Sequence, residues 1–299
     1  MKILIIAVQG IGNLVMALPM IGQLKGQVDF YVRRSAIPLI KNQPFVRKIF
    51  PFDLRKLHRD LLRLKKEKYD MAITIFPHSR LYSKLFMWAI GAKSRLQNES
   101  GDEKHSVYLN LDLIGASYKP YKYRLDKSAV EWARKYSGKY IGIHAGCSRR
   151  QLWKRWSLEK WQELIHLLID KYPEYKIFFF VGADEQKIQP MRNVIQLSEE
   201  LPRIIALISK CSFFIGNDSG LSHIASMLKV PQLTIFGPTD PLFVKPFSPN
   251  SHIITPRHNV IVYKTGRGFI DNPRKSVINQ LTVEEVFAKV KKLMKKYRI

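Results

Sequence analysis

The sequence predicts an α/β protein of two domains, each organised around a doubly wound parallel sheet. Short apolar runs without polar alternation recur along the chain, as expected of strands buried on both faces: residues 2–8, 28–32, 70–76, 140–144, 176–181, 212–215 and 233–236. The segments between them place apolar residues at helical spacing. Alternation of such strands and helices favours parallel sheets.

The length and one irregular segment predict the domain organisation. At 299 residues, a prior of about 150 residues per domain gives two domains. Residues 117–125 are rich in Tyr and Lys and lack periodicity, so we predict a first domain at 1–125 and a second at 126–299. Thr282 and Glu285 have the spacing of a capping box that starts the last helix, which would stay with the second domain or pack back on the first.

The composition is that of a globular protein with a strong excess of positive charge. Hydrophobic residues make up 46% and charged residues 25% of the chain, which excludes a disordered protein. A formal net charge of +26 predicts an anionic partner: nucleic acid, an anionic membrane surface or a phosphorylated substrate. The two cysteines, Cys147 and Cys211, form no metal-binding spacing, and such low usage fits a reducing cytoplasm.

The N-terminal half begins with a strand, a glycine-containing turn at residues 9–13 and a helix that contains Pro19. Gly10 and Gly12 give a weak dinucleotide-binding signal, because a third glycine and a later acidic residue are not clearly present. A plain tight turn between strand and helix is the favoured interpretation.

Further along, residues 54–68 predict an amphipathic helix with a very basic outer face, and 81–90 predict another helix. Ligands of doubly wound sheets bind beyond the carboxyl ends of the strands. The polar residues expected there include Asn13, Arg33, Arg34 and Arg80. Several arginines at these ends favour an anionic ligand, although most surface arginines are simply solvated.

In the C-terminal half, a strand ending at His144 is followed by a small turn with Gly146 and Ser148, and then by Lys154. Backbone N–H groups, a hydroxyl and a mobile ammonium suit a diphosphate. The alternative is that residues 153–156, Trp-Lys-Arg-Trp, form a nucleic-acid patch. We rank it lower because one such cluster, without a recognisable nucleic-acid-binding fold pattern, is weak evidence.

An acidic candidate for the site follows the strand at 176–181. Glu185 lies in the next turn, before a helix expected to run through Leu197. A carboxylate at this place suits ribose hydroxyls. A favourable charge at the helix N-terminus is an equally good explanation of Glu185.

Residues 213–241 are the most informative stretch, with a strand, a turn at 217–220, a helix, a second strand and a rigid loop. Asp218, Ser219 and Gly220 stand at the helix start, where free N–H groups and the helix dipole favour a phosphate. Asp218 can accept hydrogen bonds from sugar hydroxyls, and His223 lies one helical turn on. The simpler explanation is that Asp218 and Ser219 only cap the helix.

Two stretches resemble glycosyltransferase family 9, the bacterial ADP-heptose:lipopolysaccharide heptosyltransferases. Residues 218–241 resemble its D-[ST]-G-x-x-H core with the later G-P-T-x-P, and 144–157 resemble its H-x-G-[AS]-S … K-x-W-[PS] motif. The resemblance implies a GT-B fold, in which two Rossmann-like domains face a cleft. It also implies an inverting glycosyltransferase that moves a heptose or related sugar from an ADP-sugar and needs no tightly bound metal.

The family's residue roles then transfer to matching positions. Gly146, Ser148, Lys154, Ser219 and Gly220 would bind the donor diphosphate, and Glu185 its ribose. Asp218 and His223 would orient the donor at the catalytic centre.

The acceptor side resembles the family's first motif, G-D-x-x-x-x-x-P, with Gly12 and Pro19 in place. The family's general-base aspartate is replaced here by Asn13, and an amide has no useful basicity near neutral pH. Asn13 would therefore only position the acceptor, with Gly12, Arg33, Arg34 and Arg80 around it.

The resemblance also implies partners and a location. The acceptor would be the anionic inner core of lipopolysaccharide, reached by a monomer attached peripherally to the cytoplasmic face of the inner membrane. No nucleic-acid partner is expected. Three alternatives stay open: a relative with a different nucleotide-sugar and acceptor, a non-catalytic binder, and a basic nucleic-acid-binding protein, whose binding would depend steeply on salt.

Overall fold

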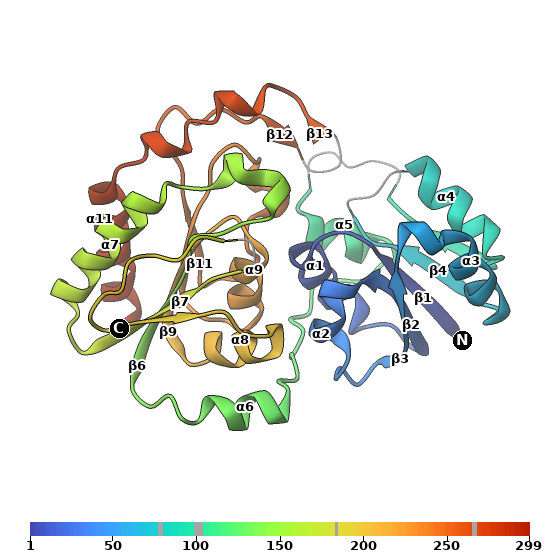
Figure 1. Ribbon diagram of the computed structural model, residues 1–299. Coiled ribbons are helices and arrows are strands. Elements are labelled where there is room, and N and C mark those ends of the chain that lie inside the picture. The colour runs from blue at the N-terminus through green and yellow to red at the C-terminus, as the bar shows by residue number, and fades with distance from the viewer. Residues whose placement is uncertain (77–79, 99–103, 183–184, 265–267) are drawn as a thin grey trace. The chain divides into compact units, whose positions relative to one another are not determined.

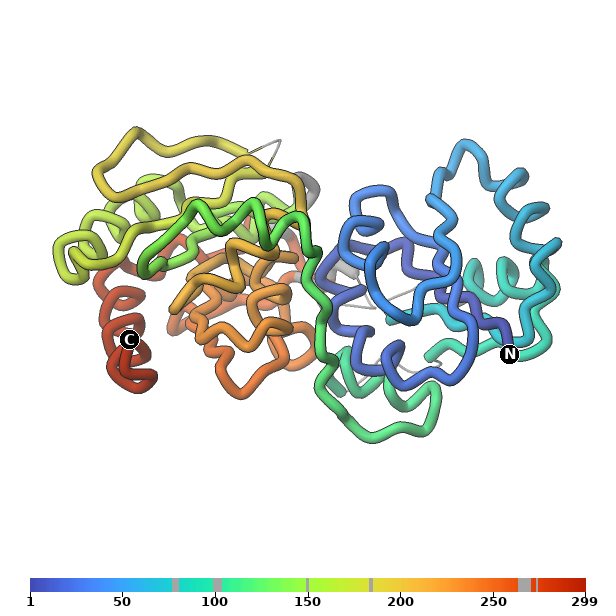
Figure 2. Tube along the Cα trace, turned by 90° about the horizontal axis from the view of Figure 1, so that it is seen from below, coloured from blue at the N-terminus to red at the C-terminus, as the bar shows by residue number. Residues whose placement is uncertain are grey.

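The computed structural model describes residues 1–76, 80–98, 104–182, 185–264 and 268–299, without the side chains of 80, 149, 150, 263, 264, 268, 269 and 273. The chain divides into two compact units, Met1–Arg124 and Leu125–Ile299. They correspond to the blue-to-teal and the green-to-red parts of the tube in Figure 2. No helix among the described residues is long and apolar enough to cross a bilayer.

The first unit is a parallel sheet of five strands in the order β3-β2-β1-β4-β5. The strands are β1 (Lys2–Ala7), β2 (Gln27–Arg33), β3 (Val46–Phe52), β4 (Met71–Thr74) and β5 (Ser94–Leu96). The helices are α1 (Ile11–Ile21), α2 (Ile37–Ile40), α3 (Leu57–Lys66), α4 (Arg80–Ala89) and α5 (Ser106–Asp112), with short 3₁₀ turns η1 (Arg34–Ala36) and η2 (Leu54–Lys56).

The order of the strands decides which face each helix covers. The chain moves from β1 to β3 in one direction and then returns past β1 to β4 and β5. Because crossovers between parallel strands are right-handed, this reversal puts α1 and α2 on one face of the sheet and α3 and α4 on the other. Figure 1 shows this division, with α5 beside α1.

The second unit has a parallel sheet of six strands in the order β11-β10-β9-β6-β7-β8. The strands are β6 (Lys139–His144), β7 (Tyr175–Phe180), β8 (Val194–Leu197), β9 (Cys211–Asn217), β10 (Gln232–Ile235) and β11 (Ser251–Ile254). The order reverses between β6 and β9, which are neighbours in the sheet. In doubly wound sheets, ligands bind beyond the carboxyl ends of the strands at such a reversal.

Helices again cover both faces of this sheet. They are α6 (Lys127–Ala133), α7 (Leu158–Lys171), α8 (Leu201–Ile208), α9 (Gly220–Met227), α10 (Pro241–Val244) and α11 (Val283–Tyr297), with the 3₁₀ turns η3 (Arg149–Lys154), η4 (Pro273–Lys275) and η5 (Ile278–Gln280). A short antiparallel pair joins β12 (Tyr263–Lys264) to β13 (Gly268–Phe269). Helix α11 packs on α7, and the predicted capping box of Thr282 and Glu285 is present.

The expected fold class, two α/β domains with doubly wound parallel sheets, is confirmed. One expected element is wrong, because the structure has no helix running through Leu197 but the strand β8. Pro190 removes a backbone donor, and the β-branched Val194 and Ile195 fit a strand better than a helix. Asn193 turns the chain into β8 with a positive φ of 62°.

Candidate functional site

The two turns that follow β6 and β9 lie side by side at the reversal point of the second sheet. His144, the last residue of β6, pairs in register with Gly216 of β9. Asn217, the last residue of β9, donates a hydrogen bond from its amide to the carbonyl of Ala145. This bond ties the turn after β6 to the turn that begins α9, so the two predicted donor-binding stretches meet in space.

Lys154 and Asp218 form a buried ion pair across these turns. The Lys154 ammonium lies 2.7 Å from a carboxylate oxygen of Asp218, and both residues are under a tenth exposed. Lys154 ends η3, and the next residue but one, Trp156, is buried and donates its indole N–H to the carbonyl of Leu281. The anchored indole holds the end of η3 in place, which fixes where the ammonium lies.

Ser219 occupies the N-cap position of α9, but its hydroxyl makes no capping bond. It lies 2.9 Å from Nδ1 of His144 instead. The explanation that Asp218 and Ser219 only cap the helix is therefore wrong, since one side chain faces Lys154 and the other His144. The N–H groups at the start of α9 stay without that acceptor, and an uncapped helix start is favourable to an anion.

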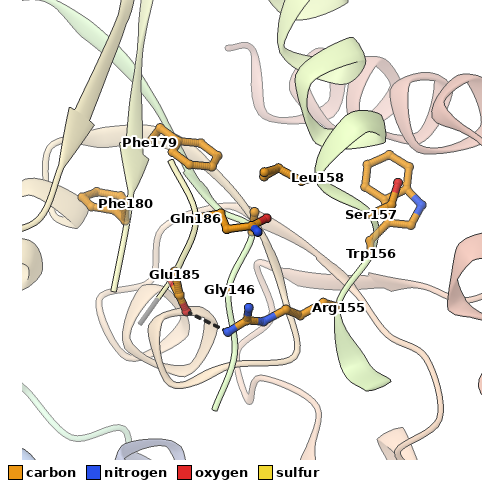
Figure 3. A pocket seen from close by; sticks show the side chains of 10 residues that line it. Gly146, Arg155, Trp156, Ser157, Leu158, Phe179, Phe180, Glu185 and Gln186 are labelled. Carbon is orange, nitrogen blue, oxygen red and sulfur yellow. Dashed lines mark ion pairs between the residues drawn. The ribbon is translucent and has the colours of Figure 1, made fainter. Parts of the chain in front are cut away.

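Glu185 completes the cluster from the turn after β7. Its carboxylate lies 3.2 Å from Nε2 of His144, accepts the backbone N–H of Gly182 at 2.7 Å and lies 3.8 Å from Arg155. Figure 3 shows Glu185 and Arg155 pointing toward one another. Burial by itself raises the pKa of Glu185, but the bond and charge of His144, the Gly182 N–H and Arg155 together bring the pKa below its usual value.

A small cavity of about 150 Å³ opens beside Glu185 and Arg155. Its walls combine these two charges with Ala145 and Gly146 of the turn after β6 and with further side chains. Figure 3 shows the latter, four apolar and two polar: Trp156, Leu158, Phe179, Phe180, Ser157 and Gln186. A Cβ atom on Gly146 would lie 1.7 Å from the Glu185 carboxylate. Glycine is thus needed at this position for the carboxylate to lie against the turn.

The remaining predicted donor residues lie on the same two stretches. Gly220 is the first residue of α9, and His223 is buried on that helix one turn after Ser219. Ser148 is exposed just before η3.

The first unit places its predicted residues after the carboxyl ends of β1, β2 and β4, and its own reversal point lies between β1 and β4. Gly12 and Asn13 lie in the first turn of α1, both partly exposed. Arg33 ends β2, donates to the carbonyl of Val8 and lies over the ring of Phe52. Arg34 is exposed at the start of η1. Arg80 is the first residue of α4, and its side chain lies outside the described residues.

Two residues of the cluster were not among the predicted site residues. His144 contacts both Ser219 and Glu185, and Arg155 approaches Glu185. The signal for His144 was present, because it is the first residue of the H-x-G-[AS]-S motif. Within the described part of the chain, no group of three or more His, Cys, Asp or Glu side chains could hold a metal ion.

Known proteins resemble the chain in sequence and in fold. The model of the family "Glycosyltransferase family 9 (heptosyltransferase)" matches residues 104–261. The E. coli K12 lipopolysaccharide heptosyltransferase 1 is 30% identical over 114 residues, and the chain spans 36% of that relative's length. The Haemophilus influenzae lipooligosaccharide heptosyltransferase 2 is 24% identical over 85% of this chain and 88% of that protein.

Among solved structures, the E. coli ADP-heptose lipopolysaccharide heptosyltransferase II superposes with a TM-score of 0.78 at 19% identity, over 100% of both chains. At that identity the likeness shows the fold alone. The family model covers more than half of the 299 residues, including every predicted donor residue. The chain therefore belongs to glycosyltransferase family 9.

Proposed function

We propose that this protein is an inverting glycosyltransferase that moves a heptose from ADP-heptose to the inner core of lipopolysaccharide. The observation that carries the proposal is the buried Lys154–Asp218 pair beside an uncapped helix start, at the reversal point of the second sheet. A buried ammonium at such a place is suited to a diphosphate. Family membership and the heptosyltransferase relatives support ADP-heptose as the donor.

The donor diphosphate would take the place of Asp218 as the partner of Lys154. Its oxygens would accept from the Ser219 hydroxyl, from Ser148 and from the N–H groups that begin at Gly220, with Gly146 leaving room for close approach. As the bond between sugar and diphosphate breaks, negative charge grows on the leaving ADP. Fixed positive groups in a site that excludes water stabilise that charge, the largest contribution in many enzymes.

Release of Asp218 from Lys154 would free its carboxylate for the donor sugar. A carboxylate next to the breaking bond can accept from a sugar hydroxyl and orient the ring for attack from the opposite face, which inverts the anomeric centre. His223, one turn further along α9, is assigned to the same orienting role.

Glu185 is assigned to the ribose. Its carboxylate is ionised at neutral pH, because its pKa is lowered, and it borders the cavity of about 150 Å³. Ribose hydroxyls would replace His144 and the Gly182 N–H as its hydrogen-bond donors. The apolar walls formed by Leu158 and Phe179 would leave space for the flat base.

The acceptor would bind at the first unit, against Gly12, Asn13, Arg33, Arg34 and Arg80. The carboxylates and phosphates of the inner core match these cations and the net charge of +26. Asn13 can hydrogen-bond an acceptor hydroxyl but cannot take its proton. We place the monomeric enzyme in the cytoplasm, attached peripherally to the inner face of the inner membrane, where basic residues gain from anionic lipid.

The test is ADP release from ADP-heptose in the presence of a lipopolysaccharide inner-core acceptor, with acceptor-free reactions as the control. We expect release that depends on the acceptor. ADP binding without any release would favour a different sugar or acceptor, or a non-catalytic binder. Absence of nucleotide binding together with salt-sensitive binding to DNA or RNA would replace the proposal by the nucleic-acid alternative.

A further inference from the structure

The first unit contains a hollow whose lining is almost entirely apolar. It measures about 430 Å³ and lies between α3, α4 and the sheet. Its apolar walls come from three places: Leu57 and Leu61 of α3, Leu85 and Phe86 of α4, and Ile6, Tyr31 and Phe52 of the strands. Neither the donor cluster nor the acceptor assignment uses this hollow. Figure 1 shows α3 and α4, its two helical walls, on the same face of the sheet.

Large apolar side chains on the elements that form the hollow are exposed: Leu54, Tyr82 and Leu85 line it, while Leu81 and Trp88 extend the apolar surface along α4 next to Leu85. On α4 the exposed fractions are 65% for Leu81, 75% for Tyr82, 53% for Leu85 and 70% for Trp88, and Leu54 in η2 reaches 72%. Soluble proteins commonly expose such residues singly, whereas a cluster around a hollow marks a contact surface. Trp and Tyr are also the side chains that favour the interface between lipid and water.

The segment of η2 and α3, which forms the wall of the hollow opposite α4, is strongly basic. The structure leaves its cations exposed: Arg55, Lys56, Arg59, Arg63, Lys65, Lys66 and Lys68. Of the acidic residues nearby, Asp53 accepts the backbone N–H of Arg55 at the start of η2, Asp60 is buried and accepts the Tyr31 hydroxyl, and Glu67 is paired with Arg47 and Lys48. The segment that supplies Leu54, Leu57 and Leu61 to the hollow therefore also carries seven exposed cations, more than the three nearby acids can neutralise.

We propose that this surface docks on an anionic bilayer leaflet, with the hollow accepting a lipid acyl chain. The charge selects this occupant, since α3 offers cations for lipid phosphates while α4 offers Leu, Tyr and Trp for the hydrocarbon boundary. A protein partner with an apolar ridge would not by itself require the row of exposed cations. The proposal rests on the membrane location given under Proposed function and adds the surface that makes the contact.

The hollow also adjoins the acceptor turn. Val8 and Gln9 line it and directly precede Gly10, from which α1 and Asn13 follow. A lipid whose chain occupied the hollow would place its polar head near this turn. Membrane docking would thereby present the sugar of a lipid-linked acceptor to the residues assigned to bind it.

Vesicle flotation tests the surface. We expect the protein to bind vesicles that contain phosphatidylcholine and phosphatidylglycerol, and to bind vesicles of phosphatidylcholine alone only weakly. The double variants Leu85→Ser with Trp88→Ser and Arg59→Ser with Arg63→Ser should each weaken binding about tenfold or more. The matched controls are Leu242→Ser, whose native side chain is as exposed as Leu85 (54% against 53%), and Lys292→Ser with Lys295→Ser on α11. Equal loss in variants and controls would overturn the proposal.

Quenching by brominated acyl chains tests whether α4 enters the lipid. The other four tryptophans belong to the second unit and lie outside this surface: Trp156 and Trp161 are buried, and Trp132 and Trp153 are partly exposed. Trp88, which is 70% exposed, should therefore account for most of any quenching of the protein's tryptophan fluorescence. We expect quenching that is largely lost in Trp88→Phe, a change that keeps the ring apolar. Quenching that persists in this variant would overturn the proposal. A dimer of the wild-type protein that dissociates in Leu85→Ser would also overturn the proposal, because a second copy of the chain would then cover the hollow.

A soluble acceptor separates this proposal from the proposed function. Transfer to a deacylated inner-core oligosaccharide should be unchanged in the Leu85 and Trp88 variant, while transfer to vesicle-borne acceptor falls. Loss of vesicle binding with intact ADP release would confirm the surface. Vesicle binding by a protein that transfers nothing would contradict the proposed function and leave the surface standing.

Discussion

Each unit contains an ion pair with a buried carboxylate, and the two pairs lie at opposite ends of the strands of their sheets. In the first unit, fully buried Asp29 accepts from Arg47 at 2.8 Å and from the Tyr69 hydroxyl at 2.7 Å. Asp29 is the third residue of β2 and Arg47 the second residue of β3, so both lie near the amino ends of their strands. In the second unit, Lys154 and Asp218 lie beyond the carboxyl ends of β6 and β9.

The position decides what each pair can do. Ligands bind at carboxyl ends, so nothing is expected to replace the partners of Asp29. Burial and the bond to Asp29 raise the pKa of Tyr69, so that its hydroxyl stays a neutral donor and the network stays complete. Lys154 and Asp218 instead hold one another where a ligand is expected. The comparison teaches that a buried ion pair is evidence of a site only where the topology brings a ligand to it.

Removing Lys154 should have the largest effect. We expect Lys154→Met to lower the rate of acceptor-dependent ADP release about 10²- to 10³-fold, the cost of losing one fixed donor to a developing charge. The variant should also lose about 3–5 kcal/mol of stability, because Asp218 is left buried and unpaired. Adding Asp218→Asn should restore stability in urea unfolding but not the rate. A single variant that still turned over donor normally would remove Lys154 from the diphosphate site.

Asp29→Asn tests the other side of the comparison. We expect a loss of about 3 kcal/mol in stability to urea, since Arg47 loses a buried partner and keeps only Glu67. ADP affinity and turnover of the folded protein should stay unchanged, because the network lies away from the ligand edge. Lys48→Ser is the control, since Lys48 is half-exposed and its pair with Glu67 contributes under about 1 kcal/mol. A change in ADP affinity would contradict the division into structural and binding pairs.

A carboxylate at the acceptor turn should have a smaller effect. We expect Asn13→Asp to raise the rate of transfer about tenfold at neutral pH, which is less than the 10²–10⁴ typical of a well-placed base, because the turn is built around an amide. The gain should disappear as pH falls and the new carboxyl is protonated, in a pH–rate profile with Asn13→Ala beside it. An unchanged rate would mean that another group or water takes the acceptor proton.

The sequence predicted the fold class because buried parallel strands are continuous apolar runs whose signal is local. It also predicted Lys154 and Asp218 separately, since each belongs to a recognisable motif. Their ion pair could not be predicted, because it joins residues 64 positions apart and depends on how two loops meet. For the same reason the sequence did not predict the contact of His144 with Glu185. Strand β8 was missed because a short apolar run fits a helix or a strand equally well, and only pairing with β7 selects the strand.

The apolar hollow could not be predicted from the sequence either. Leu85, Phe86 and Trp88 recur in a pattern that predicts an ordinary core-facing helix. Phe86 fulfils that expectation by packing on Tyr31, with ring centroids 5.3 Å apart. Leu85 and Trp88 do not, and their exposure became visible only when the position of α4 against α3 was known. Periodicity shows which residues share a helix face, but not whether that face is covered.

The smallest effect is expected from the pH dependence of Glu185. Its pKa lies below the ordinary value of 4.5, because His144, the Gly182 N–H and Arg155 outweigh the effect of burial. A lowered pKa means that ionised Glu185 stabilises the fold above pH 4.5, and that this contribution is lost as pH falls through the folded-state value. Wild type and Glu185→Gln should therefore differ in unfolding free energy by a constant amount at neutral pH, and the difference should shrink below pH 4.5. A difference that grew on acidification would mean that His144 does not favour the ionised carboxylate. Bound ADP would sharpen the comparison, since ribose hydroxyls that replaced His144 should alter the same pH dependence, whereas the loss of stability caused by Asp29→Asn should be the same with and without the nucleotide.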